Sequence, residues 1–414
     1  MSAEISEKVN LLYRDLSGKM VASLASYFGL TNLAMAEDIV QETFITAFEQ
    51  WQLKGLPEKP DAWLFKVCKN KAINAIAKKQ TQLSGDMSFP DKGKTDYQFD
   101  QLFLDHEIKD NQLRLLFACC NHSLSPKAQV VLILKHICGL RIEEIARALA
   151  MTDEAVMKMC ARSRQTLIAE KVTMHVPFLL RSHEKLHTVH LAIYLLFNEG
   201  YQATNGNEAI RKELCIEALR LIKTILDISE IKTNDTYALM ALMCFHTARF
   251  ESRISNNEFI DLENQDRSLW DKDLIRLASY YLKQIIGSTP TRFILEAAIA
   301  ALHCNADAFS VTNWAAIKEL YDQLLKIQPS PFVDVNRATA IFFSEGPAKA
   351  LTALEQSPHR SWYKNYYMYY ALLAKIYKSK GENALAIENY ERAMSLASLE
   401  QEKKYLQNQV TKLS

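Results

Sequence analysis

Apolar residues recur at helical spacing along almost the whole of this chain. The pattern i, i+3, i+4, i+7 dominates, and the strict alternation that marks half-buried strands is rare. Gly and Pro, which interrupt helices, are scarce at 11 and 10 of 414 residues. We therefore predict an all-α protein.

The most informative pattern is a pair of short amphipathic segments within residues 140–167. The first has an apolar face at helical spacing, made by Ile142, Ile145, Ala146 and Leu149. After a short break, Thr152 is placed to cap a second helix. The apolar stripe of that second helix consists of Val156, Cys160, Ser163 and Leu167.

The second of these helices is cationic. Lys158, Arg162 and Arg164 lie outside its apolar stripe and are expected to be free for other contacts. A capped, basic helix after a short turn is typical of a helix-turn-helix that enters a DNA groove. The alternative is an ordinary helical hairpin with a solvated basic face.

A first helical block precedes this motif, at residues 1–82. A helix that begins near Ala34 buries one face, made by Val40, Phe44, Ala47, Phe48 and Trp51. Its opposite face is an acidic stripe with one apolar residue: Asp38, Gln41, Glu42, Ile45 and Glu49. Such a stripe is either a solvated face or a docking surface for a basic partner helix.

A lysine-rich helix follows at residues 62–79, after the Pro57–Pro60 turn. Asp61 is placed to cap it, and no acidic residue follows Asp61 within it. Leu64, Val67, Cys68, Ala72 and Ala75 form the expected buried side. Lys66, Lys69 and Asn70 gather on the other side, with Asn74 at the margin. Uncompensated lysines on one face favour contact with a phosphate backbone, and an exposed lysine-rich helix is the alternative.

The pattern divides the chain into four parts. Residues 83–110 contain Gly, Pro and several aspartates and are expected to be an acidic linker, which either mimics nucleic acid or stays extended through self-repulsion. Residues 111–172 form the helix-turn-helix block, in which Ser125 and Pro126 start a helix that ends at Gly139. Residues 173–414 are a further helical series. Within it, residues 371–396 and, more loosely, 336–354 resemble tetratricopeptide helix pairs, so we expect a solenoid-like array.

Composition narrows the partners and the compartment. The net charge of +1 gives no overall indication of nucleic-acid binding. Any surface that faces DNA therefore has to be a local basic patch, offset by acidic segments elsewhere. The eight cysteines are scattered in apolar helical patterns and are expected to be core residues in a reducing cytoplasm. No signal-peptide pattern and no apolar run that could span a bilayer is apparent, so neither secretion nor a membrane partner is expected.

These parts, in this order, resemble bacterial extracytoplasmic-function (ECF) sigma factors. The sequences AEDIVQETF at residues 36–44 and AWLFKVCKNKAI at residues 62–73 are similar to sigma region 2, and residues 113–171 are similar to sigma region 4. The resemblance implies a promoter-specificity subunit that binds core RNA polymerase and promoter DNA. The stripe of Asp38, Gln41, Glu42 and Ile45 would dock on the clamp helices of the largest polymerase subunit, and the second block would dock on the flap.

The same resemblance assigns the DNA contacts. Lys66, Lys69, Asn70 and Asn74 would melt and read the −10 promoter element. Thr152, Lys158, Arg162 and Arg164 would face the −35 element. Asn74 stands where the family often has Asp, and Met159 where it often has a basic residue. Each departure removes a potential polar contact, so the promoter sequence cannot be copied from relatives.

The resemblance extends into the C-terminal half. YLLFNEGY at residues 194–201, ENQDRSLWD at 263–271 and PSPFVDVNRA at 329–338 are similar to the extension of one ECF subgroup, in which it is helical, tetratricopeptide-like and thought to be regulatory. Such a domain would engage a protein partner or make an intramolecular contact. This part of the chain also has four polar residues in apolar surroundings: Asn198, Glu199, Asp266 and Arg267. They would form a ligand pocket, a catalytic site or, as we favour, a buried network that holds helices in register.

Metal, cofactor and enzyme functions have little support. Cys119, Cys120 and His122 lack the paired spacing of a zinc site, and His183, His187 and His190 read better as a half-buried stripe than as ligands. No Gly-rich phosphate loop, Gly-x-Ser-x-Gly or His-Glu-x-x-His motif is present, so no cofactor and no catalysis are expected. The alternatives are a one-component regulator, with a helix-turn-helix joined to a ligand- or protein-binding helical domain, and an enzyme within residues 173–414.

Overall fold

The computed structural model describes residues 2–82, 98–174, 182–202, 210–255, 258–287 and 289–413. Within these ranges the prediction of an all-α protein is confirmed: the only strands are β1 (Ile254–Ser255) and β2 (Glu258–Phe259), which pair antiparallel. The chain forms two compact units. Unit 1 comprises residues 1–200 and 212–231, and unit 2 comprises residues 201–211 and 232–414.

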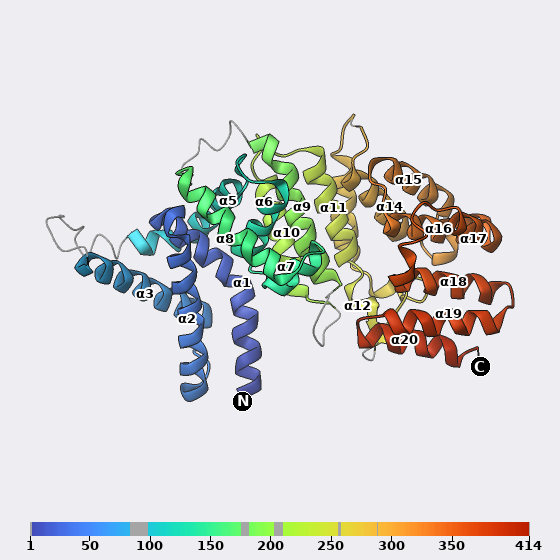
Figure 1. Cartoon of the computed structure of the whole chain (residues 1–414), viewed down its shortest axis with the longest axis horizontal. Helices are drawn as coiled ribbons and strands as arrows, with labels where there is room; N and C mark the ends of the chain where they lie inside the picture. The colour runs from blue at the N-terminus through green and yellow to red at the C-terminus, as the bar shows by residue number, and fades with distance from the viewer. Residues whose placement is uncertain are drawn as a thin grey trace. The chain divides into compact units, whose positions relative to one another are not determined.

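Unit 1 opens with long helices that share one core (Figure 1). The elements are α1 (Ser2–Phe28), the 3-10 turn η1 (Leu30–Asn32), α2 (Leu33–Lys54) and α3 (Pro60–Gln82). Met20 and Leu24 of α1 and Phe44 and Ala47 of α2 are fully or almost fully buried, and α1 packs along α2. The stripe predicted for α2 from Val40 to Trp51 is therefore the buried face, with Phe48 half-buried.

The helix-turn-helix block completes the first part of unit 1. Its helices are α5 (Asp105–Cys119), α6 (Pro126–His136), α7 (Ile142–Ala148) and α8 (Asp153–Ala169). Ser125 caps α6, its Oγ accepting from the Ala128 amide at 3.3 Å, with Pro126 at the first helical position, as expected. Gly139 follows α6 with φ 64°, a left-handed conformation that favours glycine.

The structure corrects the expected cap at Asp61 and part of the expected linker, of which residues 83–97 lie outside the described residues. Asp61 does not cap α3, because the helix already begins at Pro60 and Asp61 lies in its first turn, where it still offsets the helix dipole. Residues 98–110 are not a simple tether. Phe99 is fully buried, with its ring centroid 4.6 Å from that of Tyr27, and α5 begins at Asp105. Burial of the Phe99 ring therefore holds this part of the segment against α1, although the segment is acidic.

Two further helices belong to unit 1, beyond the expected boundary at residue 172. They are α9 (Ser182–Tyr201) and α10 (Lys212–Leu226). Unit 1 includes α9 as far as Gly200. Lys185 of α9 donates to the Phe117 carbonyl at 3.1 Å, Arg14 of α1 pairs with Glu213 of α10 at 2.7 Å, and Arg220 donates to Gln112 of α5 at 2.7 Å. The compact body therefore ends later than sequence pattern suggests.

Unit 2 begins with α11 (Asn234–Thr247), α12 (Phe250–Arg253), the two strands, and the 3-10 turn η2 (Arg267–Leu269). It continues with α13 (Lys272–Lys283), α14 (Arg292–Cys304), η3 (Phe309–Val311), α15 (Trp314–Ile327), α16 (Pro331–Glu345) and α17 (Pro347–Glu355). It closes with η4 (Tyr363–Asn365), α18 (Tyr367–Ser379), α19 (Asn383–Leu396) and α20 (Glu400–Thr411). No helix in the described ranges combines the length and apolarity needed to cross a membrane.

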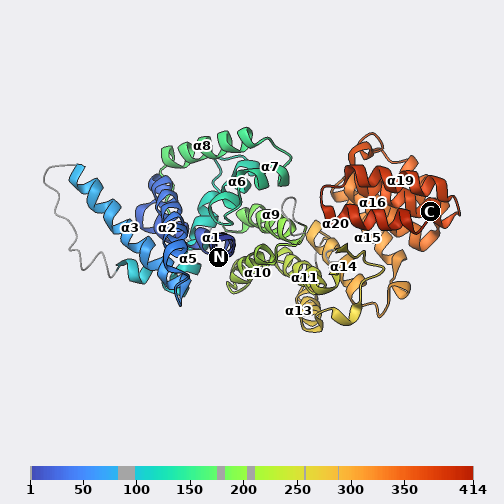
Figure 2. The ribbon, with the colours of Figure 1, turned by 90° about the horizontal axis from the view of Figure 1, so that it is seen from below.

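Successive helices of unit 2 pack as neighbours. In Figure 1, α18, α19 and α20 lie side by side, and Figure 2 shows the region of α19 and α20 from below. Helix α19 packs against both α18 and α20. Gly381, with φ 78°, allows the tight turn between α18 and α19, while Ala386, Tyr390 and Ala393 are buried. Gly346 plays the same role between α16 and α17, with φ 96°. Small residues and glycine turns thus occur where the sequence predicts helix pairs.

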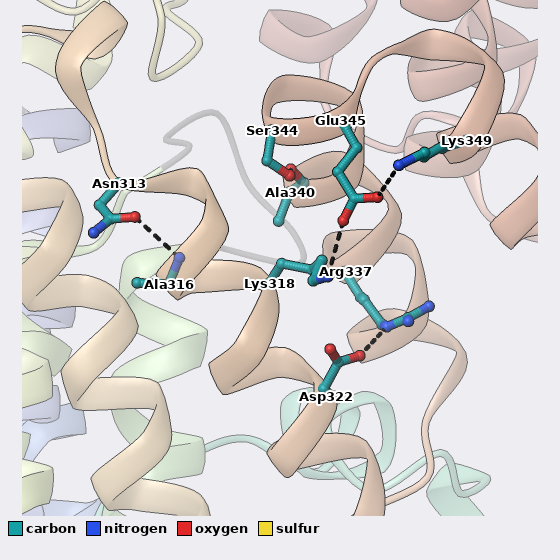
Figure 3. A network of polar contacts seen from close by, with 9 residues as sticks. All are labelled: Asn313, Ala316, Lys318, Asp322, Arg337, Ala340, Ser344, Glu345 and Lys349. Carbon is teal, nitrogen blue, oxygen red and sulfur yellow. Dashed lines mark hydrogen bonds and ion pairs between the residues drawn. The ribbon is translucent and has the colours of Figure 1, made fainter.

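A polar network ties α15, α16 and α17 together (Figure 3). The Glu345 carboxylate lies 2.8 Å from Lys318 Nζ and 3.0 Å from Lys349 Nζ, and Arg337 pairs with Asp322 at 2.5 Å. The two lysines hold the pKa of Glu345 down at about 2, chiefly through their hydrogen bonds. These pairs, which are half-buried or exposed, link the three helices and add little stability.

Candidate nucleic-acid interface

Helix α8 is held in place by its cap and by one apolar stripe. The Thr152 hydroxyl accepts from the Ala155 amide at 3.2 Å. The buried residues of α8 are those the sequence predicts: Val156, Cys160, Ser163 and Leu167. This stripe packs on α6 and α7. The helix therefore has a fixed rotation, and the side chains opposite the stripe point to solvent.

Two of the three basic residues of α8 lie on that exposed side. Lys158 and Arg162 are exposed, and Lys158 pairs with Glu154 one turn earlier at 2.6 Å. An exposed i, i+4 pair contributes only about 0.3–0.5 kcal/mol, so a phosphate group competes readily with Glu154 for the ammonium. This arrangement suits contact with a DNA backbone.

Arg164 is not free, contrary to expectation. Its guanidinium is half-buried, with Nη1 3.8 Å from Oε2 of Glu37 on α2. Glu37 also meets His136 at the end of α6, with His136 Nδ1 2.7 Å from Oε1. Burial opposes ionisation of Glu37, but the hydrogen bond and charge of His136, with the charges of Arg164 and Lys135, hold the pKa of this carboxyl below its usual value. One carboxylate of the first block thus contacts a histidine and an arginine of the second.

A close backbone approach accompanies this ionic contact. Gly18, in the middle of α1, faces the Ile137 carbonyl so closely that a Cβ at Gly18 would lie 1.9 Å from that oxygen. Gly139 lies on the other side of the same contact, where an added Cβ would be 2.9 Å from Ser17 Oγ. The two blocks that the sequence predicts to be tethered by a linker are therefore packed together within unit 1. Sequence reasoning missed this, although a glycine inside a good amphipathic helix signals a close approach.

The lysine-rich helix α3 exposes a polar face. Lys66, Asn70 and Asn74 are exposed, and Leu64, Cys68 and Ala72 are buried, as predicted. Lys69 is half-buried and pairs with Asp100 at 2.5 Å. An acidic residue from the segment expected to be a linker therefore neutralises one lysine of this face. Lys66, Asn70 and Asn74 remain exposed to solvent on this face.

The acidic stripe of α2 is exposed along its length. Asp38, Gln41, Glu42 and Ile45 all face solvent, and Ile45 leaves 57% of its surface uncovered. Glu42 has one partner on the neighbouring helix, Lys71 of α3, at 3.5 Å. An exposed isoleucine among carboxylates is a chemically sensible docking point for an amphipathic, basic partner.

The four polar residues singled out in the C-terminal half do not form one buried network. Asn198 and the buried Glu199 lie on α9 in unit 1, whereas Asp266 and Arg267 lie in unit 2. Asp266 is exposed, and its carboxylate caps η2 by accepting from the Ser268 amide at 2.8 Å, so its expected burial is wrong. Arg267 donates to the carbonyls of His303 and Ala306 at 2.8 and 2.7 Å.

A buried polar network does exist one residue away. The Gln265 side chain accepts from Arg249 Nε and from Ser252 Oγ, each at 3.3 Å, and Trp270 Nε1 donates to Ser252 Oγ at 2.8 Å. These groups link α12 to the segment after β2 and hold it in register. Gln265, which sequence reasoning did not single out, is therefore part of a buried network, whereas the predicted network of Asn198, Glu199, Asp266 and Arg267 is not formed.

The cysteines and histidines considered as metal ligands lie in different environments. All eight cysteines are buried, as the sequence predicts, and burial raises the pKa of Cys120 to about 12, while His122 is exposed. His190 is buried, which lowers its pKa to about 3, and His187 is exposed. The side chain of His183 lies outside the described residues. Across the described residues, no three such groups converge on a point where a metal ion could sit.

Comparison with known families gives three matches in chain order. Residues 13–82 match sigma-70 region 2, and residues 114–167 match sigma-70 region 4. Residues 185–286 match a family of unknown function, DUF6596. The two sigma matches coincide with the helices that carry the exposed lysine face of α3 and the capped helix α8.

Two relatives among curated proteins extend this picture. An uncharacterized protein of Rhizobium meliloti (strain 1021) is 32% identical over 398 residues, which cover 95% of this chain and 93% of that protein. A probable RNA polymerase sigma factor of Haemophilus influenzae is 25% identical over 145 residues, which cover 32% of this chain and 75% of that protein. No solved structure matches significantly.

Proposed function

We propose that this chain, which belongs to the RNA polymerase sigma factor-like proteins and shares a family with the Rhizobium meliloti relative, is an ECF-type sigma factor. In this role it binds core RNA polymerase in the cytoplasm and directs it to promoters. Its C-terminal helical domain regulates that activity. The role is one of recognition and strand separation and uses no catalytic residue or cofactor.

The observation that carries the proposal is a pair of exposed polar helix faces in the order of sigma regions 2 and 4. Lys66, Asn70 and Asn74 on α3 are available to the −10 element, and Lys158 and Arg162 on α8 to the −35 element. Both helices are fixed by buried apolar stripes, so the faces are presented by rigid elements. Phosphate contacts from the lysines and arginine give a salt-dependent affinity, and base contacts give sequence preference.

Core polymerase binding is assigned to the acidic stripe of α2. The exposed Asp38, Gln41, Glu42 and Ile45 support this, because they combine charge with one apolar contact and are not needed for the core of unit 1. The body of the α5–α8 block would engage the flap.

Run-off transcription with purified core RNA polymerase on the chain's own upstream region tests the proposal. We expect a specific transcript that is lost in the double variant Lys158→Ala, Arg162→Ala and retained in Lys8→Ala, which removes an exposed lysine from α1 instead. Absence of binding to core polymerase would refute the proposal. Binding of duplex DNA without polymerase, with residues 1–82 dispensable, would instead indicate a one-component regulator.

We further propose that unit 2 is a tetratricopeptide-like regulatory array. The helix pairs α16–α17 and α18–α19, with glycine turns and buried small residues, support this proposal. A truncation that tests it should end after Ile231 rather than after residue 172, since the earlier cut removes the partners of Arg14 and Gln112. A tethered inhibitor predicts more transcript from the truncated chain, and a required activator predicts less.

A further inference from the structure

Unit 2 contains a cavity of about 280 Å³ that no role described above uses. It is lined by residues of α14, η3, α15, α16, α18, α19 and α20, together with β2 and the segment after it, so all of its walls belong to one unit. Its volume is close to the lower limit of about 300 Å³ that is usual for small-molecule sites. A space of this size exceeds the roughly 30 Å³ that one water fills in the liquid.

The walls of the cavity are mainly aromatic. Trp314 and Phe343 stack with their ring centroids 4.5 Å apart, and Phe309 meets both edge-on, at 5.2 and 5.0 Å. Tyr390 and Tyr405, from α19 and α20, complete the lining. Aromatic surfaces of this kind bind planar apolar groups and attract cations to their faces.

The charged groups of the cavity are predominantly acidic. Asp261, Glu263 and Glu402 line it together with one cation, Lys375, so its carboxylates exceed its ammonium by two. His303 also lines it and stays uncharged, because burial lowers its pKa to about 3. Glu402 is buried and accepts from the Tyr367 hydroxyl at 2.6 Å and from Gln202 at 3.0 Å.

The position of Lys375 shows that Asp261 and Glu263 can bind a primary ammonium group. Its ammonium lies 2.7 Å from Glu263 and 3.3 Å from Asp261, and 5.7 Å from the centroid of the Phe343 ring. The chain therefore already places a primary ammonium between two carboxylates and an aromatic face. The long, flexible stem of lysine allows this group to swing out toward solvent when another cation takes its place.

Two buried polar atoms of the lining have no hydrogen-bond partner among the described residues. They are the hydroxyl of Tyr390, a residue only 1% exposed, and Nδ1 of His303. Tyr390 lines the cavity together with Asp261 and Glu263, and burial and the charges of these two carboxylates raise the pKa of its hydroxyl to about 12. An unpaired buried hydroxyl destabilises the folded unit, and a bound molecule with a polar group relieves this cost.

We propose that unit 2 binds a small aromatic molecule carrying a primary ammonium group in this cavity. Its ring lies against Trp314 and Phe343, and its ammonium takes the place of the Lys375 ammonium at Asp261 and Glu263. We assign a positive charge to the ligand because the carboxylates of the cavity outnumber its ammonium group. We assign an aromatic ring to the ligand because the walls of the cavity are aromatic. Binding is a property of unit 2 and does not rest on sigma activity.

Isothermal titration calorimetry of the full chain tests this proposal with three probes that share one ring. They are tryptamine, which is cationic, indole, which is neutral, and indole-3-propionate, which is anionic. We expect tryptamine to bind with a dissociation constant below about 1 mM and at least tenfold more tightly than the other two. Equal binding of the three probes, or no binding of tryptamine at that concentration, would overturn the proposal.

Three variants locate the site. Glu263→Gln, which changes a half-exposed side chain and should fold, is expected to weaken tryptamine binding at least fivefold, because a charged partner is lost. Glu388→Gln is the matched control, an exposed glutamate on α19 outside the lining, and should bind as the wild type does. Lys375→Met removes the competing ammonium and should tighten binding at least threefold. Equal weakening in both glutamate variants, or no tightening in Lys375→Met, contradicts the assignment.

Discussion

Replacing Gly18 by alanine should separate the two blocks of unit 1 without damaging either. The added methyl group would lie 1.9 Å from the Ile137 carbonyl oxygen, whereas ordinary contacts begin at 3.4 Å, so α1 and the end of α6 have to move apart by more than 1 Å. Ile137 O is a backbone atom and cannot rotate away. Overpacking of this kind costs about 1–3 kcal/mol.

The same substitution strengthens α1 itself. Alanine is better than glycine inside a helix by about 0.8–1 kcal/mol, so the helix gains while the contact is lost. We therefore expect Gly18→Ala to fold, with a thermal unfolding midpoint a few degrees below that of the wild type, because the cost of the contact exceeds the gain in the helix. Once the contact opens, the Arg164 guanidinium moves away from Glu37 and becomes available to DNA.

Two measurements check this reasoning. Hydrogen exchange of amides at residues 136–141 should accelerate in Gly18→Ala, because the end of α6 loses its cover. The slope of log affinity for a short duplex against log salt should steepen by about 0.9, the value for one additional phosphate contact. Glu37→Gln should steepen the slope in the same way, and Glu49→Gln, on the exposed side of the same helix, should not. Wild-type exchange together with a wild-type slope in Gly18→Ala would show that the contact between Gly18 and Ile137 does not hold Arg164 at Glu37.

Three further predictions concern the fold and the DNA-facing surface. Thr152→Ala removes the cap of α8 and should lower the free energy of unfolding by about 1 kcal/mol in urea titrations, whereas Thr152→Ser should not. The depressed pKa of His190 makes the folded state resist protonation. The contribution of a neutral His190 to the free energy of unfolding is therefore fully present above about pH 6.5 and falls by up to about 1.4 kcal/mol per pH unit below it. His190→Leu should remove this contribution and flatten the dependence of the unfolding free energy on pH. Lys66→Ala should reduce the salt slope of promoter binding by about 0.9, with no change for Lys109→Ala; an equal change in both would show that the effect is not specific to α3.

Local pattern alone predicts the helices that carry the candidate site. The buried residues of α8 form the apolar stripe read from the sequence, and Thr152 and Ser125 cap the helices they were expected to cap. This succeeds because helical periodicity and capping depend on residues a few positions apart. Both kinds of signal are complete within one helix.

Contacts between distant segments could not be predicted in the same way. Glu37 and His136 are 99 positions apart, and nothing in either helix distinguishes them from solvated polar residues. Phe99 is similar, because one aromatic residue within an acidic stretch gives no periodic signal and yet anchors that stretch to Tyr27. The cavity of unit 2 depends on residues from several helices, so no single segment reveals it.

The place of Glu37 on α2 links these observations. Glu37 precedes Asp38 of the exposed acidic stripe, and Glu37 and Gln41 line the same small pocket beside His136. A basic partner helix that docks on the stripe adds positive charge beside Glu37 and competes with His136 and Arg164 for its carboxylate. Such competition is reciprocal. A partner that docks on the stripe loosens the contact of Arg164 with Glu37, and opening that contact raises the affinity of the partner for α2. Linkage requires that the two equilibria change by the same factor. Docking on α2 and availability of α8 for DNA are therefore expected to be coupled through a single carboxylate.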